Sequence, residues 1–167
     1  ELVTMPKTLP LLALLFPVFV LTAAPEITTK DLVNTRVMVL GDSITQAGTW
    51  VSFVQYHLLK AHPQAKVDVI SIGLGSETTS GLTEGDHPFP RPCVHGRLER
   101  ALKAVQPKVV VACYGMNDGI YHPASPERDQ AFRDGINKLI SVSRAHGVDK
   151  VFLLTPPTYG GTKAITK

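Results

Sequence analysis

The sequence of 167 residues contains little cysteine, few aromatic side chains and no block of charge of one sign. Cys93 and Cys113 are the only cysteines, and without Cys-x-x-Cys spacing they indicate no metal site; whether they pair stays open. The 17 Lys and Arg residues are scattered among 14 Asp and Glu residues, which argues against a nucleic-acid partner. Hydrophobic residues make up 44% of the chain, enough for one globular domain with its own core.

An unbroken apolar run long enough to span a membrane is also missing. The longest apolar stretch, residues 9–24, is interrupted by Pro10 and Pro17 and follows Lys7. The stretch ends in the small residues Thr-Ala-Ala. A basic residue, an apolar stretch and small residues in this order are typical of a secretory signal peptide. A buried or anchoring helix is the alternative interpretation of this stretch.

These features predict three parts of the chain. Residues 1–24 are the expected signal peptide, residues 25–35 a polar linker, and residues 36–167 a single domain. We therefore expect a secreted or periplasmic protein with no stable membrane span after cleavage of the signal peptide.

Within the domain, short apolar runs alternate with longer amphipathic segments, a pattern typical of βαβ units and a parallel sheet. The predicted strands are residues 36–40, 67–72, 108–113 and 150–154, and the predicted helices are residues 50–61, 97–105 and 126–146. The last helix has the clearest ends, with Ser125 as N-cap before Pro126 and Gly147 as its C-terminal glycine. The pattern predicts an α/β fold, a flavodoxin-like three-layer sandwich with a parallel sheet.

Two polar motifs follow two of the predicted strands. Gly41-Asp42-Ser43 ends the first strand, and Gly115-Met116-Asn117-Asp118 comes shortly after the third. Because ligands in open parallel sheets bind beyond the carboxyl ends of the strands, both motifs should face one site. The loop at residues 73–92, with four glycines and three prolines, should frame that site.

The Gly-Asp-Ser and Gly-x-Asn-Asp motifs together resemble the SGNH hydrolases, also called the GDSL esterase/lipase family, and look like an exported bacterial subgroup of it. The resemblance covers residues 36–157. It implies that Ser43 is the nucleophile and that Asn117 contributes its side-chain amide to the oxyanion hole. A further backbone donor is implied at Ser76, with Gly75 as the alternative, and Gly41, Asp42, Gly115 and Asp118 are implied as supporting residues.

The family's last block, Asp-x-x-His, supplies its catalytic acid and base, and the chain contains no such block. In the family a fifth strand and a final helix complete the fold, so we expect a C-terminally incomplete domain in which strand four lies at an open edge. His87, His95 and His122 lie in loops that could frame the site, but none of them stands in the family's Asp-x-x-His context. The chain by itself is therefore expected to be nearly inactive.

We predict a serine esterase that hydrolyses O-acyl or O-acetyl groups on carbohydrate through an acyl-enzyme, with no cofactor or metal and an ester substrate as its partner. One alternative is a lipid or thioester hydrolase on the same scaffold. Another is a non-catalytic carbohydrate-binding domain that keeps the pocket and has lost the base. An α/β-hydrolase is disfavoured because Gly-x-Ser-x-Gly is absent, and a nucleotide binder because strand one lacks a glycine-rich phosphate loop.

Overall fold

A computed structural model describes residues 28–119, 122–123 and 125–156. The predicted signal peptide, the beginning of the linker and the last eleven residues of the domain lie outside the described residues. No helix of the described part is long and apolar enough to cross a membrane.

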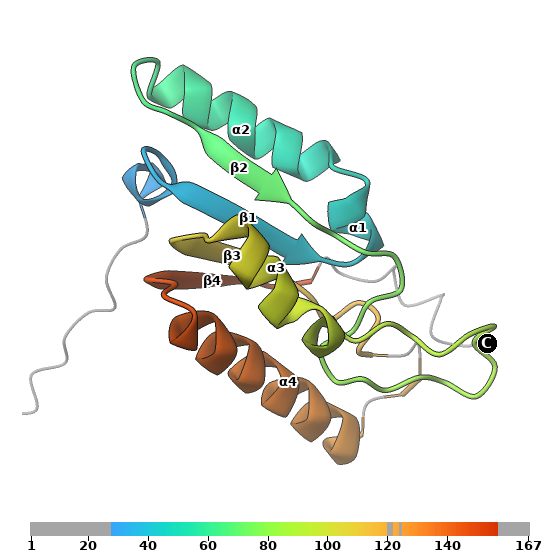
Figure 1. The fold of residues 1–167 in the computed structure, drawn as a ribbon. Helices are drawn as coiled ribbons and strands as arrows, with labels where there is room; N and C mark the ends of the chain where they lie inside the picture. Colours follow the sequence, from blue (N-terminus) through green and yellow to red (C-terminus); the bar gives the residue numbers. More distant parts are fainter. Residues whose placement is uncertain (1–27, 120–121, 124, 157–167) are drawn as a thin grey trace, which may run out of the picture.

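The core of the fold is a parallel sheet, as the sequence predicts. Its strands are β1 (Arg36–Gly41), β2 (Asp68–Ser71), β3 (Val109–Cys113) and β4 (Lys150–Leu154), in the order β2-β1-β3-β4. The predicted bounds are met for β4. They differ by one residue at one end of β1 and of β3, and by one residue at each end of β2. The order places β1 and β3, the strands that precede the two polar motifs, side by side at the centre (Figure 1).

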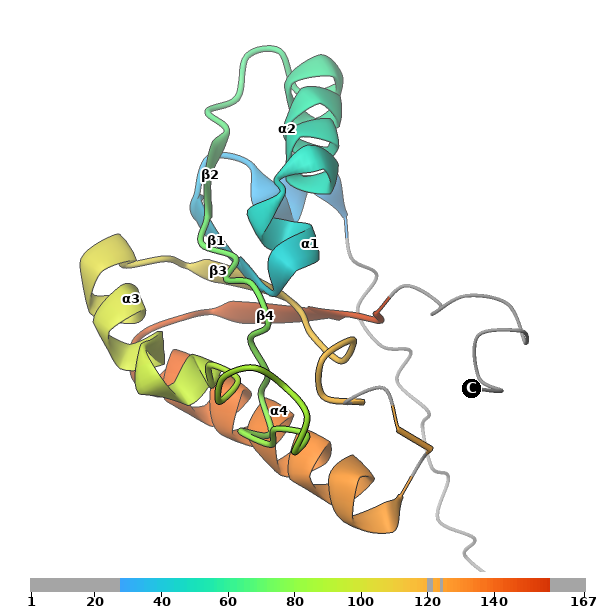
Figure 2. The same cartoon turned by 90° about the vertical axis from the view of Figure 1, so that its right-hand side faces the viewer.

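Helices cover both faces of the sheet, so the predicted three-layer α/β sandwich is confirmed. One face carries α2 (Thr49–Ala61), and the other carries α3 (Leu98–Val105) and α4 (Pro126–Ala145) (Figures 1 and 2). Shorter elements are the 3-10 helices η1 (Thr29–Leu32) and η2 (Val94–Gly96) and the one-turn helix α1 (Ser43–Gln46). The sequence pattern does not predict α1, because four residues are too few to show helical periodicity.

Side chains that alternate along the central strands pack into two hydrophobic cores, one on each face of the sheet. Met38 and Leu40 of β1 pack with α3 and α4, whereas Val37 and Val39 pack with α2. Because both faces of the sheet are covered, β1 is apolar along most of its length. Its sequence is a continuous run of apolar residues and does not alternate between apolar and polar residues.

The ends of α4 agree with the sequence prediction. The Ser125 hydroxyl oxygen accepts a hydrogen bond from the backbone N–H of Arg128 at 3.2 Å, and Pro126 occupies the first turn. Gly147 follows the helix with a φ of +81°, a conformation that favours glycine. This helix is fixed by its caps as well as by the burial of Leu139.

The α2 face of the sheet is less completely covered toward β4. A cavity of about 180 Å³ there is lined only by apolar and aromatic residues, among them Leu32, Trp50, Val54, Val111, Phe152 and Leu154. Leu153 and Leu154 of β4 are 46% and 41% exposed. Strand β4 is an edge of the described sheet, and its side chains are covered less well than those of β1 and β3.

Candidate active site

Ser43 lies where β1 gives way to α1. Asp42 caps the helix, because its Oδ1 accepts a hydrogen bond from the backbone N–H of Ile44 at 2.9 Å. The Asp42 side chain is buried, whereas Ser43 is exposed. In the described part of the chain, no side chain forms a hydrogen bond with the Ser43 hydroxyl. The turn therefore presents a serine hydroxyl at the carboxyl end of the central strand.

The loop after β2 packs directly against this serine turn. Gly73 fits there only because it lacks a side chain: a Cβ atom would lie 2.3 Å from the backbone nitrogen of Gln46. The backbone N–H of Leu74 donates to the carbonyl of Gly41 at 2.9 Å. These contacts bring the serine turn and the loop after β2 together at one edge of the sheet.

The loop also distinguishes the two candidate backbone donors by the hydrogen bonds that they make. The Gly75 N–H already donates to the side-chain oxygen of Gln46 at 2.7 Å. Ser76 has a φ of +62°, in the left-handed region that glycine tolerates best. The occupied N–H of Gly75 makes Ser76 the better candidate for an oxyanion donor, and its backbone already has the conformation that a glycine would favour.

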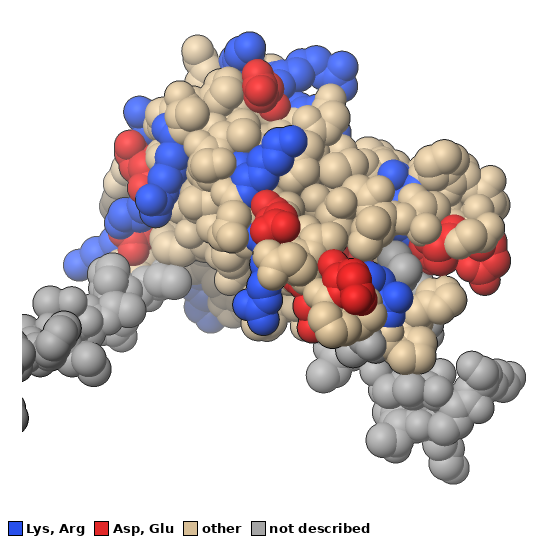
Figure 3. All heavy atoms as spheres, turned by 90° about the horizontal axis from the view of Figure 1, so that it is seen from below, with Lys and Arg blue, Asp and Glu red and all other residues tan. Residues whose placement is uncertain are grey.

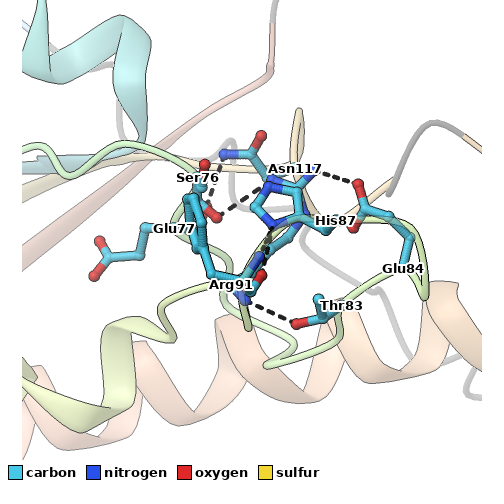
Figure 4. Close-up of polar contacts among 8 residues, drawn as sticks. Ser76, Glu77, Thr83, Glu84, His87, Arg91 and Asn117 are labelled. Carbon is cyan, nitrogen blue, oxygen red and sulfur yellow. Dashed lines mark hydrogen bonds and ion pairs between the residues drawn. The ribbon is translucent and has the colours of Figure 1, made fainter.

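Asn117 is buried beside this loop and donates from Nδ2 to the carbonyl oxygen of Glu77 at 3.1 Å (Figure 4). Its neighbour Asp118 braces the same loop through one carboxylate oxygen. Asp118 Oδ1 accepts hydrogen bonds from the Thr79 N–H at 2.9 Å, the Thr79 hydroxyl at 3.1 Å and the Ser80 N–H at 2.8 Å. The motif at residues 115–118 thus holds the loop after β2 in place and brings an amide side chain to it.

Buried acidic groups surround these turns and shift neighbouring pKa values. Burial raises the pKa of Asp42, and the nearby carboxylates of Asp118 and Glu77 raise it further. Burial also raises the pKa of the Cys113 thiol, with Asp42 contributing in the same direction. Cys93 and Cys113 are both free, so no disulfide restrains the site.

A shallow hollow of about 560 Å³ opens beside Ser43. It is lined by Ser43, Ile44, Ala47, Thr49, Trp50 and Phe53. Phe53 is 61% exposed and Ile44 is 37% exposed, so apolar surface borders the serine hydroxyl. This space is large enough for a small ester group next to Ser43.

None of the three loop histidines is hydrogen-bonded to Ser43. A ring nitrogen of His87 bonds the carbonyl of Phe89 at 2.5 Å, and its ring packs edge-on against the Phe89 ring. Burial lowers the pKa of His95, and the positive charge of Lys138 lowers it further. His122 is exposed. The structure therefore pairs none of them with the candidate nucleophile.

One pair in the sequence has the spacing of the Asp-x-x-His block, with Glu in place of Asp: Glu84 stands three residues before His87. This pair is not among the candidates selected from the sequence. In the structure Glu84 binds Arg91 instead, with Arg91 Nε 2.6 Å from Glu84 Oε2 and a second contact from Arg91 Nη2 to Glu84 Oε1. The Arg91 guanidinium lowers the pKa of Glu84 to about 2. Figure 4 shows Arg91 reaching between Glu84 and Ser76, so this pair ties the loop together.

Among the described residues, no group of three or more His, Cys, Asp and Glu side chains is placed to hold a metal ion. On the face seen in Figure 3, acidic and basic side chains are intermixed. That face offers no field of one sign to attract a polyanion.

Comparison with known proteins identifies the family to which the chain belongs. The GDSL-like Lipase/Acylhydrolase family matches residues 39–166, which include both strand-end motifs and the loop between them. The chain belongs to this family, which confirms the resemblance to the SGNH hydrolases. Comparison with curated proteins gave no match.

Solved structures share the fold at low sequence identity. A variant of an acetyl xylan esterase from Geobacillus stearothermophilus is 18% identical with a TM-score of 0.56, covering 72% of this chain and 59% of its own. An alpha/beta hydrolase enzyme from the metagenome of Lake Arreo, Spain, is 19% identical with a TM-score of 0.58. The match covers 74% of this chain and 61% of that enzyme's chain. A G-D-S-L family protein from Desulfitobacterium hafniense is 20% identical with a TM-score of 0.53. The match covers 79% of this chain and 66% of that protein's chain. The chain thus spans about three fifths of the length of the first two.

Proposed function

We propose that this chain carries the nucleophile and the oxyanion hole of a serine esterase that removes acyl groups, chiefly acetyl groups, from carbohydrate. The observation that carries the proposal is the meeting of three elements at one sheet edge. The exposed Ser43 turn packs against the loop that bears Ser76, and Asn117 bonds the next residue of that loop.

In the proposed reaction, the Ser43 oxygen attacks the ester carbonyl carbon while a base takes the hydroxyl proton. The carbonyl oxygen becomes negative in the tetrahedral intermediate and accepts hydrogen bonds from the backbone N–H groups of Ser43 and Ser76 and from the Asn117 amide. As the intermediate collapses, the bond between the carbonyl carbon and the sugar oxygen breaks, and that oxygen takes the proton from the protonated base. The sugar leaves as a free hydroxyl, and the acyl group stays on Ser43. Water then attacks the acyl-enzyme, releasing the carboxylic acid and restoring the serine.

Family membership supports an ester substrate, and the acetyl xylan esterase among the structural neighbours supports the choice of a carbohydrate ester. The predicted signal peptide supports the same choice, since secretion would bring the enzyme to extracellular or periplasmic polysaccharide. The apolar hollow beside Ser43 is shallow, which suits a short acyl group.

The test is hydrolysis by the protein expressed from its full coding sequence. The substrates are acetylated xylooligosaccharides and a series of p-nitrophenyl esters with acyl chains of increasing length. The proposal expects release of acetate from the oligosaccharides and the highest kcat/KM for the acetyl ester. A maximum at long acyl chains would favour a lipid hydrolase, and carbohydrate binding without turnover would favour a non-catalytic domain.

A further inference from the structure

Glu77 combines a fully buried carboxylate with a direct contact to Asn117. Its side chain has no exposed surface, and Arg97 pairs with it twice, from Nε to Oε1 at 2.6 Å and from Nη2 to Oε2 at 2.6 Å. The Tyr114 hydroxyl also donates to Oε2 at 2.6 Å. Because an unpaired buried carboxylate is very unfavourable, these donors fix the position of the Glu77 side chain closely.

The two side-chain partners of Glu77, Arg97 and Tyr114, come from separate parts of the chain, and Arg97 also bonds a third part. Arg97 immediately precedes α3 and also donates from Nη2 to the carbonyl of Ile72 at 2.7 Å, just beyond β2. Tyr114 directly follows β3 and is nearly fully buried. Burial and the Glu77 carboxylate raise the pKa of Tyr114, so its hydroxyl stays protonated and keeps donating. The network joins the ends of two strands and the start of a helix around one carboxylate.

The backbone of Glu77 is held at both ends. Its N–H donates to the carbonyl of Leu74 at 3.2 Å, which closes the turn that contains Ser76. Its carbonyl oxygen accepts the hydrogen bond from Asn117 Nδ2 at 3.1 Å. An amide nitrogen carries two N–H groups, so this bond orients the side chain and leaves the second N–H for a substrate oxygen.

We propose that Glu77 is a positioning residue for the oxyanion hole: its side chain, locked by Arg97 and Tyr114, fixes the carbonyl that orients the Asn117 amide. Figure 4 shows the Glu77 carboxylate pointing away from Asn117, so its effect on the amide passes through the Glu77 backbone. The inference rests on the proposed function only for the role that it gives Asn117. A preorganised donor is effective only when its support is rigid, and this network supplies that support.

The first test reads the position of Asn117 without using activity. In the 167-residue chain, Glu77→Gln should shift the two side-chain amide proton resonances of Asn117 and speed their exchange with solvent several-fold. Glu99→Gln makes the same chemical change in an exposed pair, 3.7 Å from Lys103, and should leave both unchanged. Unchanged Asn117 resonances in folded Glu77→Gln would overturn the proposal.

The second test measures kinetics in the protein from the full coding sequence. Glu77→Gln should lower kcat about 10-fold to 100-fold and change KM by less than about twofold, as expected for a displaced rather than a deleted donor. Tyr114→Phe removes one of the three donors and should give a smaller loss of the same kind. A variant with lower thermal stability but wild-type kcat would show that the network is only structural.

Two further results keep the tests separate. If Glu77→Gln does not fold, Tyr114→Phe decides: wild-type Asn117 resonances in that variant would overturn the proposal. If the wild-type protein hydrolyses no ester, the proposed function fails, and the amide resonances still report whether Glu77 positions Asn117.

Discussion

The side chain of Gln46 accepts a hydrogen bond from the backbone N–H of Gly75 at 2.7 Å, and this contact ties the helical turn that bears Ser43 to the loop that bears Ser76. Gln46 ends α1, and Gly75 lies 29 residues further along the chain. This bond links the turn and the loop whose backbone N–H groups, at Ser43 and Ser76, are proposed to act on the same carbonyl oxygen.

We expect Gln46→Ala to lower kcat about 10-fold, because the loop loses the bond that sets the distance between Ser43 and Ser76. KM should change little. The measurement is steady-state hydrolysis of p-nitrophenyl acetate by the protein from the full coding sequence. Gln55→Ala, which removes a weak 3.4 Å contact to the Val69 carbonyl on the same side of the sheet, is the control and should keep wild-type kcat.

Ser43→Ala should abolish hydrolysis and prevent labelling by a fluorophosphonate ester, since Ser43 is the proposed nucleophile. Ser52→Ala is the matched control, because this serine is exposed on α2 and only bonds the Gly48 carbonyl. Intact-mass spectrometry after incubation with the reagent checks labelling. Wild-type turnover by Ser43→Ala would rule out the assignment.

Replacement of Asn117 by alanine should reduce kcat by roughly 100-fold to 1000-fold with little change in KM, the loss expected for one oxyanion donor. A change confined to KM would instead make Asn117 a substrate-binding residue. Asn137→Ala on the exposed face of α4 should have no effect on either constant.

The Glu84–Arg91 pair predicts a pH dependence of stability. The Arg91 guanidinium lowers the pKa of Glu84 from its ordinary 4.5 to about 2 in the folded protein. The pair therefore stabilises the fold above about pH 4.5, and this contribution is lost as the pH falls toward about 2. Urea unfolding midpoints should fall more steeply over this range in the wild type than in Glu84→Gln. Identical slopes for the two proteins would contradict the prediction, and Glu99→Gln should follow the wild type.

The 167-residue chain by itself should show only residual ester hydrolysis, about a thousandfold over water, because no described side chain is hydrogen-bonded to the Ser43 hydroxyl. Comparison of its kcat with that of the protein from the full coding sequence tests this. Equal rates would point to His87, His95 or His122 as the base, and replacing each with glutamine would identify it.

Much of the fold could be predicted from the sequence because the sheet is buried on both faces. A strand such as β1 is then a short apolar run between polar segments, and the caps of α4 are residues with strong local preferences. The one-turn helix α1 could not be predicted, since its formation depends on the Asp42 cap and on packing against β1 rather than on periodicity.

The candidate site divides in the same way. Ser43 and Asn117 stand in short motifs after strands, so local sequence was enough to select them as candidates. Ser76 became a candidate, with Gly75 as the alternative, through the resemblance to the family. The choice of Ser76 over Gly75 needed the structure, because the bond that occupies the Gly75 N–H comes from Gln46, distant in sequence. The partner of Glu84 also needed the structure. Its spacing to His87 is that of the Asp-x-x-His block, but in the folded protein its carboxylate pairs with Arg91.

The sequence by itself determined the layered α/β fold, the family and the residues that carry its motifs, because all three depend on local patterns of hydrophobicity and short polar motifs. Only the tertiary structure decided which groups meet. Glu77 illustrates why, since its proposed role depends on contacts with Arg97, Tyr114 and Asn117 at separations of 20, 37 and 40 residues. Hydrogen bonds over such separations exist only once the strands and helices have packed, and no local pattern encodes them.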